Sequence, residues 1–138
     1  MSLDLITKKM VSKPKQLFII DGLGALLSAF LLGIVLVKFE SVFGIPVFTL
    51  YILASLPILF ALYDISAYCS QANKTPSLLK GIAILNLLYC FLSIGFAFYH
   101  LQIITTWGWI YFMGETLIVL TLSLLEYKVA QSLRQKVN

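Results

Sequence analysis

Charge is scarce in this sequence. Lys, Arg, Asp and Glu make up only 12% of the 138 residues, whereas 60% are hydrophobic and the mean hydropathy is +0.96. A soluble domain is about 25% charged and roughly half apolar. The composition therefore excludes an ordinary water-soluble domain, whose surface needs more charge than this chain supplies.

Cysteine and histidine are also few. The sequence has Cys69, Cys90 and one histidine, His100, without a C-x-x-C pair. Metal centres and thiol redox sites need several such residues at recurring spacings, so we expect no metal and no cofactor. Both cysteines are interpreted as small buried hydrophobic residues. Because no nucleophile–base motif is present and the tails and loops are short, we predict no catalytic residue.

The apolar residues fall into four runs. Each is close to the ~20 residues that cross ~30 Å of hydrocarbon, and backbone groups in lipid must be satisfied within each run as a helix. We therefore predict an all-α polytopic membrane protein, an up-down-up-down bundle of four transmembrane helices in a single domain. The predicted spans are residues 17–37, 47–69, 81–99 and 107–127.

The basic residues predict the orientation. All but Lys38 of the 10 Lys and Arg residues lie in the N-terminal tail, the middle connection or the C-terminal tail. Such residues are retained in the cytoplasm, so both termini are predicted to be cytoplasmic in the cell inner membrane. The opposite ends of the spans carry the amphipathic aromatic residues of a membrane interface, Tyr111 among them. No aromatic-interleaved basic groove suggests nucleic acid. The N-terminal tail is either an interfacial helix ending before Pro14 or unstructured.

Small and polar residues recur at helical spacing in each span, so they share one face. We expect that face to point inward, where small residues allow close approach and polar ones bond between helices. Its members are Asp21, Ala25, Ala29 and Gly33; Ala54, Pro57, Ala61, Asp64 and Tyr68; Ala83, Asn86, Cys90, Ser93, Ala97 and His100; and Glu115 and Glu126.

Four of these residues form the candidate polar site: Asp21, Asp64, Asn86 and Glu115. A charged carboxylate in hydrocarbon costs at least ~2.5–3.5 kcal/mol, and no Lys or Arg lies inside a predicted span. The first three are predicted to meet in the cytoplasmic half of the bundle. Asp21 and Asp64 either reach toward the cytoplasm or link helices, or they bind a proton or a cation.

Depth separates the two glutamates. Glu115 lies near mid-span, so we expect it to face the interior and to hold its proton at pH 7. It is either a packing residue bonded to Asn86, Ser93 or a backbone carbonyl, or a proton or cation site. Glu126 is expected almost at the membrane interface.

Six segments carry a resemblance: D-G-L-G-A at 21–25, G-I-V-L-V-K-F-E at 33–40, F-G-I-P at 43–46, L-L-Y-C at 87–90, Y-H at 99–100 and Y-F-M-G-E at 111–115. Together they resemble a group of small uncharacterised four-span bacterial inner-membrane proteins, and the resemblance covers most of the chain. It implies the same topology and membrane, but no activity.

Three classes of function follow from these features. The favoured one is a non-catalytic membrane protein that assembles in the lipid bilayer with a second copy or another membrane protein, as the small-residue stripes indicate. The alternative is a small proton- or cation-linked transporter or channel that uses the intramembrane carboxylates. An intramembrane enzyme ranks last, because neither a nucleophile–base motif nor a metal-ligand cluster is found.

Overall fold

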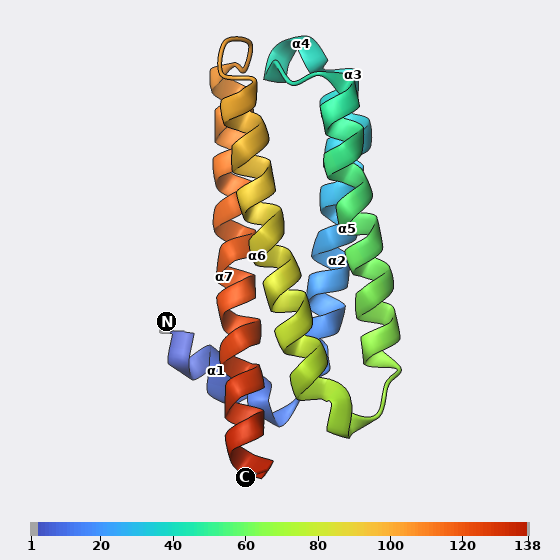
Figure 1. Cartoon of the computed structure of the whole chain (residues 1–138), viewed down its shortest axis with the longest axis vertical. Coiled ribbons are helices and arrows are strands. Elements are labelled where there is room, and N and C mark those ends of the chain that lie inside the picture. Colours follow the sequence, from blue (N-terminus) through green and yellow to red (C-terminus); the bar gives the residue numbers. More distant parts are fainter. Residues whose placement is uncertain (1–2, 138) are drawn as a thin grey trace.

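The computed structural model describes residues 3–137, and within that range it consists of helices and short turns without a strand (Figure 1). Four helical stretches are long and apolar enough to cross a membrane: Gln16–Lys38, Val47–Tyr68, Ala72–Tyr99 and Thr106–Gln135. The all-helical class and the four candidate spans are thereby confirmed. The elements are α1 (Leu3–Ser12), α2 (Gln16–Phe30), the π-helical η1 (Leu31–Val35), α3 (Leu36–Lys38), α4 (Glu40–Phe43), α5 (Val47–Tyr68), the 3₁₀ turn η2 (Ala72–Lys74), α6 (Thr75–Tyr99) and α7 (Thr106–Val137).

Two helices are longer than the predicted spans. α6 begins at Thr75, where Pro76 fits the first turn because its missing N–H has no intrahelical acceptor there. α7 continues to Val137, ten residues beyond the predicted end at 127. Charged residues marked those ends in the sequence, but Lys, Gln and Arg are good helix formers, so a helix need not stop where its apolar run stops.

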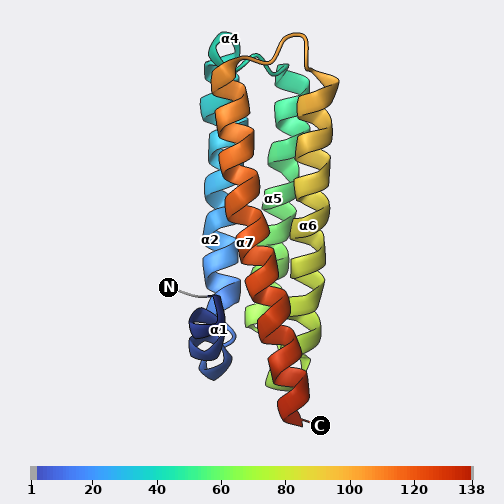
Figure 2. The same cartoon turned by 90° about the vertical axis from the view of Figure 1, so that its left-hand side faces the viewer.

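The long helices form two close pairs, α2 with α5 and α6 with α7, and α5 contacts α6 between them. Figures 1 and 2 show that α2 and α7 share the remaining side of the bundle. The turn containing α4 lies at the upper end of Figure 1, and the C-terminus lies at the lower end. We use "upper" and "lower" in that sense below.

The N-terminal segment is helical rather than unstructured, and α1 ends at Ser12, before Pro14. It packs against the lower part of α7 (Figure 1), with its apolar residues Ile6, Met10 and Val11 against a buried cluster there. Lys128 Nζ lies 3.8 Å from Asp4 Oδ1, but this pair is too exposed to stabilise the contact appreciably. Apolar packing therefore holds α1 in place.

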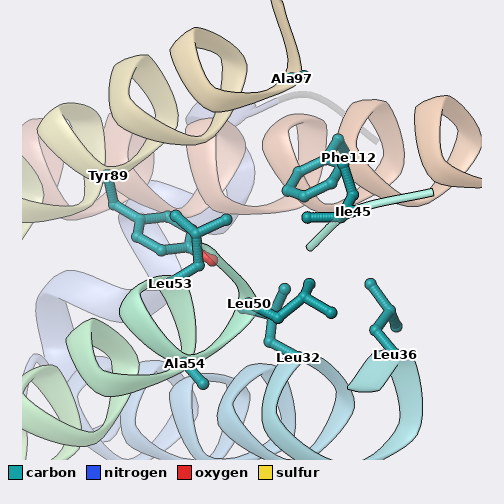
Figure 3. Close-up of a cluster of buried hydrophobic side chains, with 9 residues drawn as sticks. All are labelled: Leu32, Leu36, Ile45, Leu50, Leu53, Ala54, Tyr89, Ala97 and Phe112. Atoms are coloured by element: carbon teal, nitrogen blue, oxygen red, sulfur yellow. The ribbon is translucent and has the colours of Figure 1, made fainter. Parts of the chain in front are cut away.

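Two apolar clusters fill the ends of the bundle. The upper apolar cluster, drawn in Figure 3, consists of Leu32, Leu36, Ile45, Leu50, Leu53, Ala54, Tyr89, Ala97 and Phe112. The lower apolar cluster consists of Leu17, Phe18, Ala67, Leu79, Ile82, Leu125, Val129 and Ala130. Each of the four long helical stretches contributes to both clusters, so both extend across the bundle.

The predicted inward face is largely buried, including its members on α5 and α6 from Ala54 to Asp64 and from Ala83 to Ala97. Tyr68 is an exception, with an exposed side chain. Cys69 is also exposed, contrary to its interpretation as a buried residue, because α5 ends at Tyr68 and Cys69 is its C-cap. Cys90 is buried as expected.

Two glycines allow the upper turns to meet. Gly44 has φ 74°, and a Cβ there would lie 2.2 Å from the backbone oxygen of Ile103. A Cβ on Gly108, in the first turn of α7, would lie 2.2 Å from the backbone oxygen of Phe43. Real Cβ atoms essentially never come that close to another atom, so the α4 turn packs on residues 103–105 and on α7 only because both positions are glycine.

Candidate functional site

A polar layer lies between the two apolar clusters, and each of the four long helices contributes one side chain to it. Asp21 of α2 is 3% exposed, Asp64 of α5 is 1%, Asn86 of α6 is 5% and Glu126 of α7 is 0%. Three of these four are predicted site residues, and the structure brings them together. Small neighbours make this approach possible: Gly22 of α2 lies directly against Asp64 of α5.

Asn86 is the hydrogen-bond donor of the layer. Its Nδ2 donates to Asp21 Oδ1 at 2.7 Å and to Glu126 Oε1 at 2.9 Å. A primary amide has two N–H groups, so Asn86 has no further proton to donate. A single side chain of α6 thereby links α2 to α7.

The remaining carboxyl oxygens of the layer have no such donor. Asp21 Oδ2, Glu126 Oε2 and both oxygens of Asp64 are buried without one. Within the described residues, one Lys or Arg side chain forms an ion pair with a carboxylate. It is Lys128, and its partner is Asp4, which does not belong to the layer. A buried acceptor without a donor is costly. The layer therefore has unused capacity to accept hydrogen bonds or to hold protons.

The geometry of the carboxyl groups indicates how that capacity is used. The Asp21 carboxyl is close enough to both the Asp64 and the Glu126 carboxyls to interact with them electrostatically. Ionised carboxylates only accept hydrogen bonds, so two carboxyl groups bond to each other only when one of them carries a proton. A proton held in the layer would therefore be able to link carboxyl groups of different helices.

Glu115 lies in a second polar group, higher in the bundle. Tyr89 Oη donates to Glu115 Oε1 at 2.5 Å, and Tyr111 Oη donates to Glu115 Oε2. The Ser28 hydroxyl of α2 is a third polar group near this carboxyl and lines the same cavity. We call Ser28, Tyr89, Tyr111 and Glu115 the Glu115 group.

Sequence reasoning was wrong about the partners of Glu115, and it placed Glu126 outside the layer that Asp21, Asp64 and Asn86 form. Neither Asn86 nor Ser93 bonds to Glu115; the donors are tyrosines, of which Tyr111 had been assigned to the interface. Glu126 is instead fully buried in the polar layer, where its Oε1 accepts a hydrogen bond from Asn86. Its spacing of eleven residues from Glu115, about three turns, was the signal that both point inward.

A cavity of about 350 Å³ joins the polar layer to the Glu115 group. It lies mainly between α2 and α7, with Asn86 and Tyr89 of α6 and Pro57 and Phe60 of α5 behind them. Its polar lining is Asp21, Ser28, Asn86, Tyr89, Tyr111 and Glu115. Its rims include Leu27, Ile110 and Ile118, whose side chains are exposed on the outside of the bundle. We call this cavity the lateral groove.

The groove opens sideways, because its ends are closed. Leu17 and Phe18, one turn before Asp21, belong to the lower apolar cluster. Phe112, next to Tyr111, and Leu32, one turn after Ser28, belong to the upper apolar cluster. The polar groups are therefore separated from both ends of the bundle by packed apolar side chains.

No family model matches the chain, and no curated protein or solved structure is similar to it. The groups present, carboxyls, an amide and phenol hydroxyls, are able to bind protons and to exchange hydrogen bonds. Across residues 3–137, no group of three or more His, Cys, Asp or Glu side chains is arranged to hold a metal ion. His100 instead shares a hydrogen bond with Thr49 Oγ1 through its Nε2, at 2.9 Å and far from the polar layer.

Proposed function

We propose that this chain is a multi-pass protein of a bacterial inner membrane, an up-down-up-down bundle with both termini in the cytoplasm. Four apolar helices of spanning length support the membrane assignment. The orientation is supported by Lys and Arg, which gather at the lower end of the bundle in the tails and in the connection around Lys74. The lipid bilayer is then its first partner.

The native cysteines test this orientation. A membrane-impermeant maleimide added to intact cells should not label the wild-type chain, because Cys69 would face the cytoplasm and Cys90 is buried. The same reagent should label Cys69 in inverted vesicles. A Cys69→Ser chain carrying Gln102→Cys, at the exposed opposite turn, should give the reverse pattern. Labelling of Cys69 from outside intact cells would refute the orientation.

We further propose that the protein is a small proton-linked transporter, the alternative among the sequence-based hypotheses. The observation that carries this proposal is the polar layer, with four buried carboxyl oxygens that lack an N–H or O–H donor. A purely structural core gains more from apolar residues than from partly satisfied polar groups. Binding and releasing protons would explain why these carboxyl groups are buried here, whereas packing alone would not.

The closed ends of the bundle favour a carrier over an open channel. A channel needs a continuous hydrated path, whereas the apolar clusters lie above and below the polar groups. A carrier instead presents its site to one side at a time and needs such barriers. The proton-binding groups of this carrier are the polar layer and the Glu115 group.

An assembling membrane protein without transport activity stays the second candidate. Gly95 of α6 favours it, since this residue is exposed and has no atom within 4 Å of its would-be Cβ. Such a position allows another helix to approach closely. The two candidates differ in one observable, because an assembling protein carries no protons.

Proton flux into liposomes decides between them. Purified wild-type chain should dissipate an imposed pH gradient, and Asp21→Asn or Glu115→Gln should slow it at least about tenfold, the effect of ~1.4 kcal/mol on a barrier. Asp4→Asn makes the same chemical change on exposed α1 and should leave the flux unchanged. Background-level flux in every chain would contradict the transporter and favour assembly.

A further inference from the structure

The lateral groove has the shape of a site for a molecule that enters from the side. Its exposed rims, Leu27, Ile110 and Ile118, are apolar, whereas Asp21, Asn86 and Glu115 line its interior. Gly24 and Gly114 also line it, and a Cβ at either position would meet no atom within 4 Å. A fitting occupant has an apolar body and one polar group.

The charge of that polar group follows from the lining. Both ends of the groove carry a carboxyl group, Asp21 at one and Glu115 at the other, and no Lys, Arg or His lines it. An anionic headgroup would be repelled, and a bare acyl chain would leave the carboxyl groups unpaired. The lining therefore complements a positive charge.

An unpaired carboxyl oxygen indicates which end of the groove binds the positive charge. Each Glu115 oxygen already accepts a hydrogen bond from a tyrosine, whereas Oδ2 of the 97% buried Asp21 has no N–H or O–H donor. The rings of Phe60 and Tyr89, in edge-to-face contact at 6.1 Å, also line the groove. A groove that combines a carboxylate with aromatic rings favours organic cations.

We propose that the lateral groove between α2 and α7 binds an amphipathic organic cation, with its cationic group at Asp21 and its apolar body along Gly24 and Gly114. This inference rests on the proposed function, because it names the solute class that exchanges with the proton. Binding is an exchange with a proton held in the polar layer: the O–H bond of a protonated carboxyl breaks, the proton passes to a base in the surrounding buffer, and the resulting carboxylate offsets the charge of the cation. Charge is conserved in this step.

Octyltrimethylammonium is a suitable test cation, because it has a permanent charge and no proton of its own. Calorimetric titration of the purified chain in dodecyl maltoside micelles should show saturable binding. The neutral 1-octanol and the anionic octyl sulfate should bind at least about tenfold more weakly, a difference of ~1.4 kcal/mol. Titrations in buffers of different ionisation enthalpy should reveal a proton released on binding.

Two glycine variants form the matched control. Gly114→Leu adds a side chain inside the groove and should weaken binding of the cation at least about tenfold. Gly95→Leu adds the same side chain on α6, outside the groove and in equally open space, and should bind as wild type does. Asp21→Asn adds no volume and should abolish both the binding and the proton release.

Equal binding of octyltrimethylammonium and 1-octanol would overturn the inference, and so would unchanged binding in folded Gly114→Leu or Asp21→Asn. The proposed function fails separately. Proton flux without cation binding refutes the groove assignment alone. Saturable cation binding with background proton flux, measured in liposomes supplied with octyltrimethylammonium, supports the groove and refutes the transporter.

Discussion

Replacing Asn86 with alanine should lower the free energy of unfolding by about 3 kcal/mol. The substitution removes both N–H donors of the polar layer and leaves Asp21 Oδ1 and Glu126 Oε1 unpaired beside the oxygens that already lack donors. Leaving a buried acceptor unsatisfied costs about 1–3 kcal/mol each. Equilibrium unfolding in mixed micelles of sodium dodecyl sulfate and dodecyl maltoside measures the change.

The matched control is Asn73→Ala, which makes the same chemical change in the exposed turn η2. We expect its effect to stay within about 0.5 kcal/mol of wild type. Equal stabilities of Asn86→Ala and Asn73→Ala would show that the polar layer contributes nothing to the fold, and that its hydrogen bonds are replaced by water or by proton sharing.

Gly108→Ala should destabilise the protein by about 2–3 kcal/mol, although glycine to alanine inside a helix normally stabilises. Alanine is favoured over glycine in a helix by up to ~1 kcal/mol. The new Cβ, however, would lie 2.2 Å from the Phe43 backbone oxygen, so the α4 turn must move away from α7. The same mixed-micelle unfolding experiment gives the sign.

Gly95→Ala provides the comparison, because its Cβ meets no atom within 4 Å on the long helix α6. We expect it to be neutral or stabilising by up to ~1 kcal/mol. The two substitutions are chemically identical, so opposite signs isolate the contact between Phe43 and Gly108. A stabilising Gly108→Ala would mean that the upper turn is not packed on α7.

The spans and the inward face were predictable because apolar length and helical spacing are local properties. Asp64 and Asn86 repeat with small residues at intervals of three or four, and that spacing alone puts them on the face that contacts another helix. Burial of both residues follows from it. To predict the layer that they form with Asp21, it was enough to assume that helices of similar length lie alongside one another.

The parts that sequence reasoning missed depend on where helices end and how they tilt. The depth of Glu126 was measured from the end of its apolar run, whereas α7 extends to Val137 and α1 covers its lower part. The tyrosine partners of Glu115 come from two helices, and their meeting depends on the rotation of α6 against α7. The lateral groove depends on the separation of α2 from α7, which no local pattern encodes.

The packing of the two apolar clusters has an energetic consequence for a cell. Side chains from all four long helices close the bundle above and below its polar groups. An ion that crossed the membrane would move through a voltage worth ~2.3 kcal/mol per charge at 100 mV, and this resting bundle gives it no wet path to do so. In the proposed membrane, protons would therefore cross only in the steps in which the clusters part, and many closed copies would add no continuous leak to the stored electrical energy.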